Sequence, residues 1–182
     1  MFWASILCPC GLAGTGGLEY QPRMVEDQKY PQKAESIMDH EISAVLEYGA
    51  PDPGETATMM EQKLRFHTDS WDLSVDLEAG VSEIVVIDAR SRDAYAAGHI
   101  PGAISFPHRE MSAENTTGLD RSRVYVVYCD GIGCNASTKG SHKLARLGFR
   151  TKELLGGFDW WSRDGHPVVT SLEPGSLHAA AE

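Results

Sequence analysis

The chain has 182 residues, of which 42% are hydrophobic and 23% charged, a composition typical of one folded globular domain. It contains no apolar run of about 18 residues, which argues against a membrane-spanning helix. Its net charge of -10 has the opposite sign to that of a general nucleic-acid binder. We therefore expect no nucleic acid and no membrane among its partners.

The charge is unevenly distributed along the chain. Residues 1–83 hold 15 acidic and 5 basic residues, whereas residues 84–182 hold 11 of each kind. Within this second part, residues 121–163 carry eight basic and three acidic residues. Such a cluster attracts small anions, although a solvated helix face has the same composition.

The first residues are predicted to lie outside the main domain. Residues 1–30 combine a short apolar run with a glycine-rich stretch, and no basic residue precedes Arg23. A secretory signal requires an early positive charge, so we expect a disordered lead instead. A translation start at Met24 or Met38, or a membrane tether through residues 2–14, are the alternatives.

Residues 31–65 are expected to form a helical extension. Apolar residues recur at helical spacing over 34–48, and a second helix is predicted over 56–65. The proline- and glycine-rich residues 49–54 separate the two helices. We expect these helices to pack on the main domain or to form the contact of a homodimer.

Residues 66–170 are predicted to form an α/β domain, followed by a loose tail over 171–182. Short apolar runs predict strands over 84–87, 103–106, 124–128 and 153–155, and amphipathic segments predict helices over 91–97, 136–147 and 158–163. Strands that alternate with helices indicate a central parallel sheet flanked by helices in three layers.

Four cysteines occur in two pairs, Cys8 with Cys10 and Cys129 with Cys134. They are too few for a disulfide scaffold in a chain of this length. Their spacing does not provide the four ligands of a closed zinc site. We therefore expect no metal and no cofactor.

Cys129 follows the strongest predicted strand and precedes a helix that is expected to begin at Ala136. Ligands of parallel sheets bind at the carboxyl ends of strands. Loop amides and a helix N-terminus favour the thiolate form and lower the pKa of a cysteine. The position therefore predicts a reactive thiol, with an inert core cysteine as the alternative.

Three separated motifs resemble those of rhodanese domains. Residues 86–90 and 95–103 resemble the first signature of that family, residues 127–129 with the loop that follows resemble its active-site element, and residues 155–161 resemble its closing signature. Together they cover residues 84–167 in the order and spacing of the family. Among rhodaneses, the chain is most similar to the single-domain, phage-shock-protein-E-like group.

The resemblance implies a rhodanese-like three-layer fold and a sulfurtransferase mechanism. Cys129 would attack a small anionic sulfur donor such as thiosulfate, become a persulfide, and pass the sulfur to a thiol or cyanide acceptor. Asp88 and Arg90 would order the loop and the sheet edge. The amides of the loop would bind the substrate and stabilise the persulfide anion. These loop residues are Asp130, Gly131, Ile132, Gly133, Cys134, Asn135 and Ala136.

Two features depart from the pattern of the family. The common loop is Cys-x-x-Gly-x-Arg, whereas this loop is longer and has no Arg or Lys before Lys139. The missing cation argues against efficient thiosulfate turnover, and Asn135 in place of an Arg argues against phosphatase chemistry. Cys134 is either a resolving thiol for Cys129 or a small wall residue.

The sequence thus predicts a cytoplasmic sulfurtransferase that uses Cys129. The alternative is a non-catalytic rhodanese-like domain that binds a partner or senses oxidants through Cys129 and Cys134.

Overall fold

The computed structural model describes residues 43–176, and the chain divides into two units, residues 1–50 and 51–182. In the first unit, the described residues contain the short 3-10 helix η2 (Ala44–Leu46), whose side chains are exposed. The α-helix predicted over 34–48 is therefore wrong at its described end, and its first part lies outside the described residues. The predicted lead over 1–30 also lies outside them.

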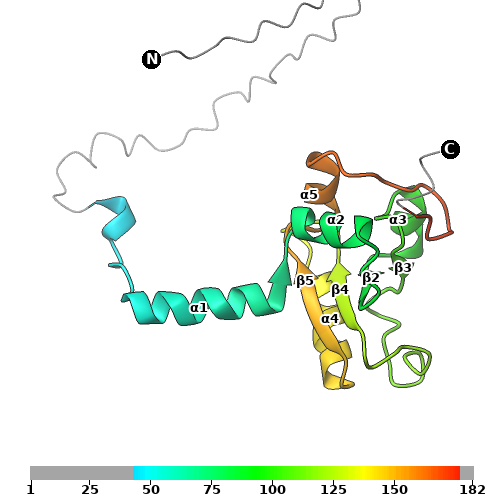
Figure 1. Cartoon of the computed structure of the whole chain (residues 1–182), viewed down its shortest axis with the longest axis horizontal. Helices are drawn as coiled ribbons and strands as arrows, with labels where there is room; N and C mark the ends of the chain where they lie inside the picture. Colours follow the sequence, from blue (N-terminus) through cyan, green and yellow to red (C-terminus); the bar gives the residue numbers. More distant parts are fainter. Residues whose placement is uncertain (1–42, 177–182) are drawn as a thin grey trace, which may run out of the picture. The chain divides into compact units, whose positions relative to one another are not determined.

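The second unit is built on a five-stranded parallel sheet with the order β1-β5-β4-β2-β3 (Figure 1). Its strands are β1 (His67–Thr68), β2 (Ile84–Asp88), β3 (Ile104–Ser105), β4 (Val124–Tyr128) and β5 (Arg150–Leu154). The apolar runs of β2 and β4 pair in register from Ile84 opposite Val124 to Asp88 opposite Tyr128. Both strands therefore end at the same edge of the sheet.

Helices cover both faces of this sheet, as predicted for a three-layer α/β domain. The helices of the unit are α1 (Pro53–Phe66), α2 (Ser70–Glu78), α3 (Arg92–Ala97), α4 (Ala136–Arg146) and α5 (Gly157–Arg163). One core cluster joins Leu73 of α2, Tyr95 of α3 and Trp161 of α5 to the sheet, and Figure 1 shows α2 and α5 side by side. The opposite cluster packs Leu144 of α4 against Val127.

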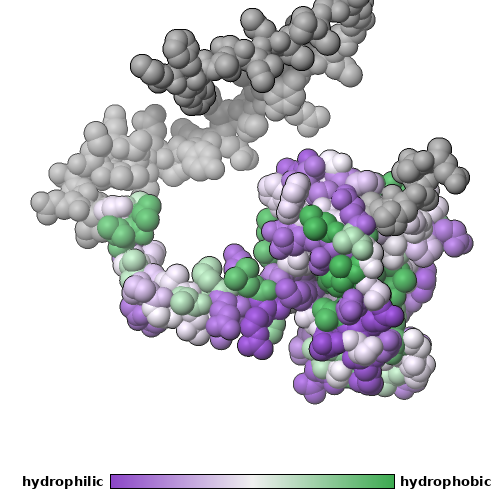
Figure 2. Space-filling model, viewed as in Figure 1, coloured by the Kyte–Doolittle hydropathy of each residue, from purple (hydrophilic) through white to green (hydrophobic). Residues whose placement is uncertain are grey.

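Helix α1 begins earlier than predicted because its first turn is capped. The Asp52 carboxylate accepts hydrogen bonds from the amides of Gly54 and Glu55, and Pro53 occupies the first helical position. None of its residues is buried. Figure 2 shows hydrophobic surface on this helix, where Met60 and other apolar side chains are exposed.

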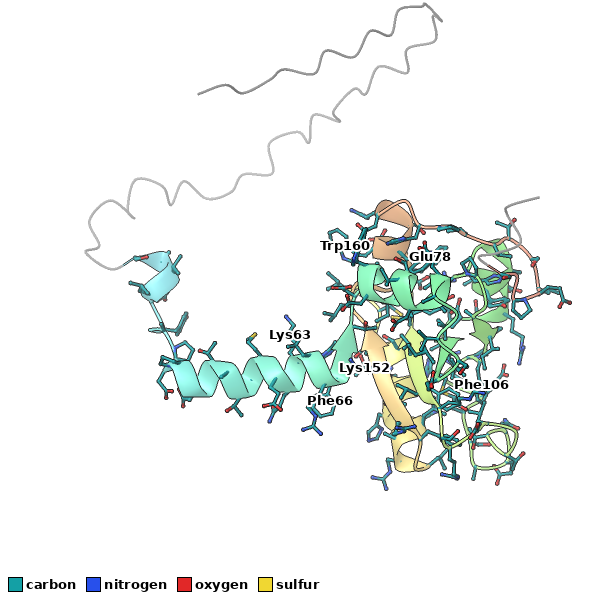
Figure 3. All side chains as sticks on the ribbon, viewed as in Figure 1. Lys63, Phe66, Glu78, Phe106, Lys152 and Trp160 are labelled. Carbon is teal, nitrogen blue, oxygen red and sulfur yellow. The ribbon has the colours of Figure 1, made fainter. Side chains whose placement is uncertain are left out.

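The end of α1 is tied to the sheet by Lys152 of β5. Its ammonium group donates to the carbonyl oxygens of Leu64, at 3.0 Å, and His67, at 3.3 Å. Figure 3 labels Lys152 beside Phe66 at this junction. Because the Lys152 ammonium group binds the carbonyl oxygens at the end of α1, it is not available to bind an anion elsewhere.

Two elements of this region were not predicted, and one was predicted with the wrong bounds. Strand β1 has two residues, and α2 directs the small side chains of Ser70 and Ser74 inward, so neither shows a strong apolar pattern. Strand β5 starts at Arg150 rather than at residue 153. Its polar residues pair with β4 from Arg150, which lies opposite Val124, and polar residues gave no apolar pattern that predicts a strand.

The segment after α5 returns to the sheet domain. His99 and Val169 form an antiparallel bridge with two backbone hydrogen bonds, and the Gly102 amide donates to Pro174 O at 2.7 Å. Residues 171–176 contain no helix or strand. Within residues 43–176, no helix is both long and apolar enough to cross a bilayer.

Candidate active site

Cys129 follows directly on the last residue of β4, and its residue is 2% exposed. Its Sγ atom lies 2.9 Å from the carbonyl oxygen of Cys134 and 3.7 Å from that of Gly131. The hydroxyl of Ser137, in the first turn of α4, lies 3.1 Å from the sulfur. The described contacts therefore enclose the sulfur at the point where the sheet passes into the loop.

These surroundings correct the predicted ionisation of the thiol. Burial raises the pKa of Cys129 above its usual value, and the nearby Cys134 acts in the same direction. The amide of Ser137 opposes this rise, as its hydroxyl does whenever it donates to the sulfur, but the two do not cancel it. The sequence predicted a lowered pKa because a helix start follows the loop, but loss of water around the sulfur outweighs that contribution.

Ser137 connects the sulfur to a carboxylate on the neighbouring strand. Its hydroxyl donates to Oε1 of Glu153 at 2.6 Å, and the Thr138 hydroxyl donates to the same oxygen at 2.8 Å. Glu153 stands in β5, opposite Val127 of β4. A chain of contacts thus runs from Cys129 through Ser137 to Glu153.

A cavity of about 250 Å³ opens beside the sulfur. Its wall consists of Cys129, loop residues Gly131, Ile132, Cys134 and Asn135, the first turn of α4 at Ser137 and Thr138, and residues 153–157. Among the described residues that line it, Glu153 is the charged side chain, and none is a lysine or arginine. Lys139, the first basic residue after the loop, is exposed on α4.

The structure separates the predicted loop residues into three groups. Gly131, Ile132, Cys134 and Asn135 line the cavity of Cys129. Asp130 and Ala136 line a second cavity of about 440 Å³, which Cys134 also borders. Gly133 is exposed, and a side chain added there would meet no atom within 4 Å.

Asp88 and Arg90 form a buried ion pair at the end of β2. The guanidinium donates to both carboxylate oxygens of Asp88, at 2.7 to 3.1 Å, and to the carbonyl oxygen of Gly98. A further bond at 3.2 Å reaches Asp130 in the loop. Although burial opposes the charged form, the Asp88 carboxylate raises the pKa of Arg90. Arg90 therefore links the end of β2 to Asp130 in the loop that follows Cys129.

The start of α5 is hydrogen-bonded to the first two residues of the Cys129 loop. The amide of Phe158 donates to the Cys129 carbonyl oxygen at 2.9 Å, and the amide of Asp159 donates to that of Asp130 at 2.7 Å. Gly157 has a φ of +58°, and a Cβ there would overlap the Cys129 carbonyl oxygen. Glycine is thus required for the close approach of α5 to the loop.

Sequence reasoning missed Ser137 and Glu153. Ser137 is the second residue of a helix, where a serine has no distinctive signal, and the sequence pattern predicts for Glu153 only a place in a strand. A charged residue at the buried end of a strand is the signal that was available. Within residues 43–176, no group of three or more His, Cys, Asp or Glu side chains is placed to hold a metal ion.

Two other motif residues have structural positions. His99 is fully buried and stacks on the Tyr95 ring with centroids 3.7 Å apart. Trp161 is buried in the core, whereas Trp160 is 43% exposed on α5 (Figure 3).

Comparisons with known proteins identify one family. The model of the rhodanese-like domain matches residues 72–164, just over half of the chain. The HTH-type transcriptional regulator Rv0324 of Mycobacterium tuberculosis is 36% identical over 91 residues, which cover 50% of this chain and 39% of that protein. Thiosulfate sulfurtransferase 16 of Arabidopsis thaliana is 28% identical over 92 residues, covering 45% of this chain and 77% of that protein.

A solved structure shows the same fold. The BH2092 protein from Bacillus halodurans is 40% identical and superposes with a TM-score of 0.64, over 66% of this chain and 88% of that one. The chain spans less than two thirds of the length of the first curated relatives that it matches.

Proposed function

The chain belongs to the rhodanese-like domain family, and on that premise we propose that it is a sulfurtransferase that uses Cys129. The observation that supports this proposal most strongly is the position of the thiol. It lies at the carboxyl end of a central strand, beside a cavity and the first turn of a helix. Parallel sheets bind ligands at this edge.

The proposed reaction has two half-steps. The Cys129 thiolate attacks the outer sulfur of a donor such as thiosulfate, an S–S bond forms, and the donor S–S bond breaks as sulfite leaves with the electron pair. A thiol or cyanide acceptor then attacks the outer sulfur of the persulfide and releases the Cys129 thiolate. The amide and hydroxyl of Ser137 are positioned to stabilise the anion.

The charge around the cavity favours some donors over others. Glu153 lines the cavity, and Arg90 is neutralised by Asp88 and Asp130. The described residues that line the cavity offer a dianion such as thiosulfate no counter-ion, and the Glu153 carboxylate opposes its entry. We therefore propose that neutral or singly charged persulfides react faster than thiosulfate.

Thiocyanate formation from thiosulfate and cyanide tests the activity. We expect wild-type protein to form thiocyanate and the Cys129→Ala variant to give only the background rate. After incubation with donor, the mass of the Cys129 peptide should increase by one sulfur atom. Equal rates for the two proteins, together with no added sulfur, would overturn the proposal.

Redox sensing is a second candidate function, and the position of Cys134 favours it. Both thiols are free, and Cys134 lines the same cavity as Cys129. A peroxide would oxidise Cys129 to a sulfenic acid, and attack by Cys134 would form a disulfide and release water. We expect a loss of two thiols after mild oxidation of wild type, but not of Cys134→Ser. Wild type that keeps all of its thiols after mild oxidation would remove this candidate.

A further inference from the structure

Two acceptors compete for the hydroxyl hydrogen of Ser137. The oxygen lies 2.6 Å from Glu153 Oε1 and 3.1 Å from Cys129 Sγ. A serine hydroxyl carries one hydrogen and so can donate to only one of them. The bond to a carboxylate is charge-assisted and stronger than a bond to a neutral thiol. The hydrogen therefore points to Glu153, and a lone pair of the Ser137 oxygen faces the sulfur.

Two carbonyl oxygens near the sulfur are also acceptors, and the Ser137 amide is a donor that acts against them. The carbonyl oxygen of Cys134 lies 2.9 Å away, and that of Gly131 lies 3.7 Å away. A carbonyl oxygen attracts an S–H group and repels a thiolate. These contacts match the protonated form of Cys129, and burial raises the pKa of the thiol in the same direction.

We propose that Glu153 is a positioning residue that holds Cys129 as a thiol by keeping the Ser137 hydrogen away from the sulfur. The inference rests on the proposed role of Cys129 as the nucleophile. Activation requires the hydroxyl to rotate from Glu153 to the sulfur while the thiol proton leaves to a base in solution. Glu153 then keeps its 2.8 Å bond from Thr138, so the carboxylate is not left without a partner.

Several titratable groups surround this chain of contacts. Cys134 of the loop lines the same cavity, Asp130 of the loop lies beside Arg90 on the second cavity, and Asp159 of α5 lies beside Gly131. His67 of β1 and His142 of α4 line a cavity that Glu153 also borders. Because every variant retains these groups, comparison at equal pH isolates the effect of the substituted side chain.

The test is the rate at which iodoacetamide alkylates Cys129, followed by the mass of its peptide between neutral and alkaline pH. The Glu153→Gln substitution keeps the shape of the side chain and removes its charge. Because a charged acceptor roughly doubles the strength of a hydrogen bond, we expect about a tenfold faster reaction at neutral pH in this variant. The pH profile should also shift to lower pH.

A double-mutant cycle decides whether the effect passes through the hydroxyl. Ser137→Ala removes the hydroxyl hydrogen that Glu153 withholds from the sulfur, so we expect no acceleration from Glu153→Gln in that background. A gain that persists in the double variant would show that Glu153 acts by simple charge repulsion, and would overturn the proposal. An unchanged rate in the single Glu153→Gln variant would overturn it as well.

The Glu83→Gln variant is the charge-matched control. Glu83 precedes β2 at the opposite end of the sheet, and its removal should leave the alkylation rate unchanged. Circular dichroism melting curves identify variants that have lost the fold. Alkylation requires no sulfur donor, so this result is independent of the thiocyanate assay. An absence of sulfur transfer and an absence of Glu153 control are therefore distinguishable.

Discussion

Two neighbouring strands end at the same edge of the sheet, but their termini are stabilised differently. The end of β2 carries the buried Asp88–Arg90 pair, with several charge-assisted hydrogen bonds. The end of β4 carries Cys129, a buried neutral thiol held by carbonyl and hydroxyl oxygens. The comparison shows that Arg90 holds the end of β2 in place, whereas none of the described residues lining the cavity of Cys129 is a lysine or an arginine.

The largest expected effect is on the stability of the β2 end. Arg90→Met leaves Asp88, which is fully buried, without its counter-ion. Removing one partner of such a pair costs about 3–5 kcal/mol, so the free energy of unfolding in urea should fall by that amount. Arg92→Met is the control, because its pair with Glu110 is exposed. An equal loss in both variants would contradict the structural role of Arg90.

A smaller effect is expected where α5 meets the β4 end. In Gly157→Ala, the methyl group overlaps the Cys129 carbonyl oxygen, and the residue keeps a φ of +58°. Backbone strain of this kind costs about 1–3 kcal/mol, measured by thermal or urea unfolding. Gly133→Ala, in the loop that follows Cys129, meets open space and should be close to neutral. Equal stability of the two variants would contradict the close packing of α5.

The thiol itself makes stability depend on pH. Its pKa is raised by burial in the folded state, so its contribution is complete below the ordinary thiol range and is lost as pH rises through the folded pKa. The stability of wild type relative to Cys129→Ala should therefore decline above neutral pH, by up to about 1.4 kcal/mol per pH unit. A constant difference between pH 7 and strongly alkaline pH would show that the thiol is not desolvated.

The smallest effect on stability is expected from the ion pair between Arg90 and the exposed side chain of Asp130. The Asp130 side chain is 67% exposed, although it reaches Arg90 at 3.2 Å. Surface pairs contribute less than about 1 kcal/mol, so Asp130→Asn should change the unfolding free energy only slightly. A loss as large as that of Arg90→Met would mean that the loop, rather than Asp88, determines the position of the guanidinium.

Much of this architecture was predictable from the sequence because it depends on local apolar patterns. The apolar runs of β2 and β4 are rich in β-branched residues, as is typical of buried parallel strands. The two strands pair in register, so both end at the same edge of the sheet. The position of Cys129 at that edge followed directly. Helix α2 escaped prediction because two of its buried residues are serines, and their burial depends on packing rather than on pattern.

The chemistry of the site was less predictable than its position. The sequence places glycines and a helix start after Cys129, which favours an ionised thiol. The pairing of Ser137 with Glu153 depends on the register of β5, whose polar residues gave no reliable bounds. The direction of a single hydroxyl hydrogen thus depends on a contact between elements that are separate in sequence.

The bridge between His99 and Val169 has a practical consequence for protein production. The matched family segment ends at residue 164, yet the later residues form hydrogen bonds with His99 and Gly102 in the turn at 99–102. A truncation at residue 164 would expose the His99 imidazole, which stacks on Tyr95, to solvent. The exposed turn would then be more easily cleaved by proteases. Shortened proteins intended for crystallisation should therefore extend at least through Pro174, whose carbonyl oxygen accepts the hydrogen bond from the Gly102 amide.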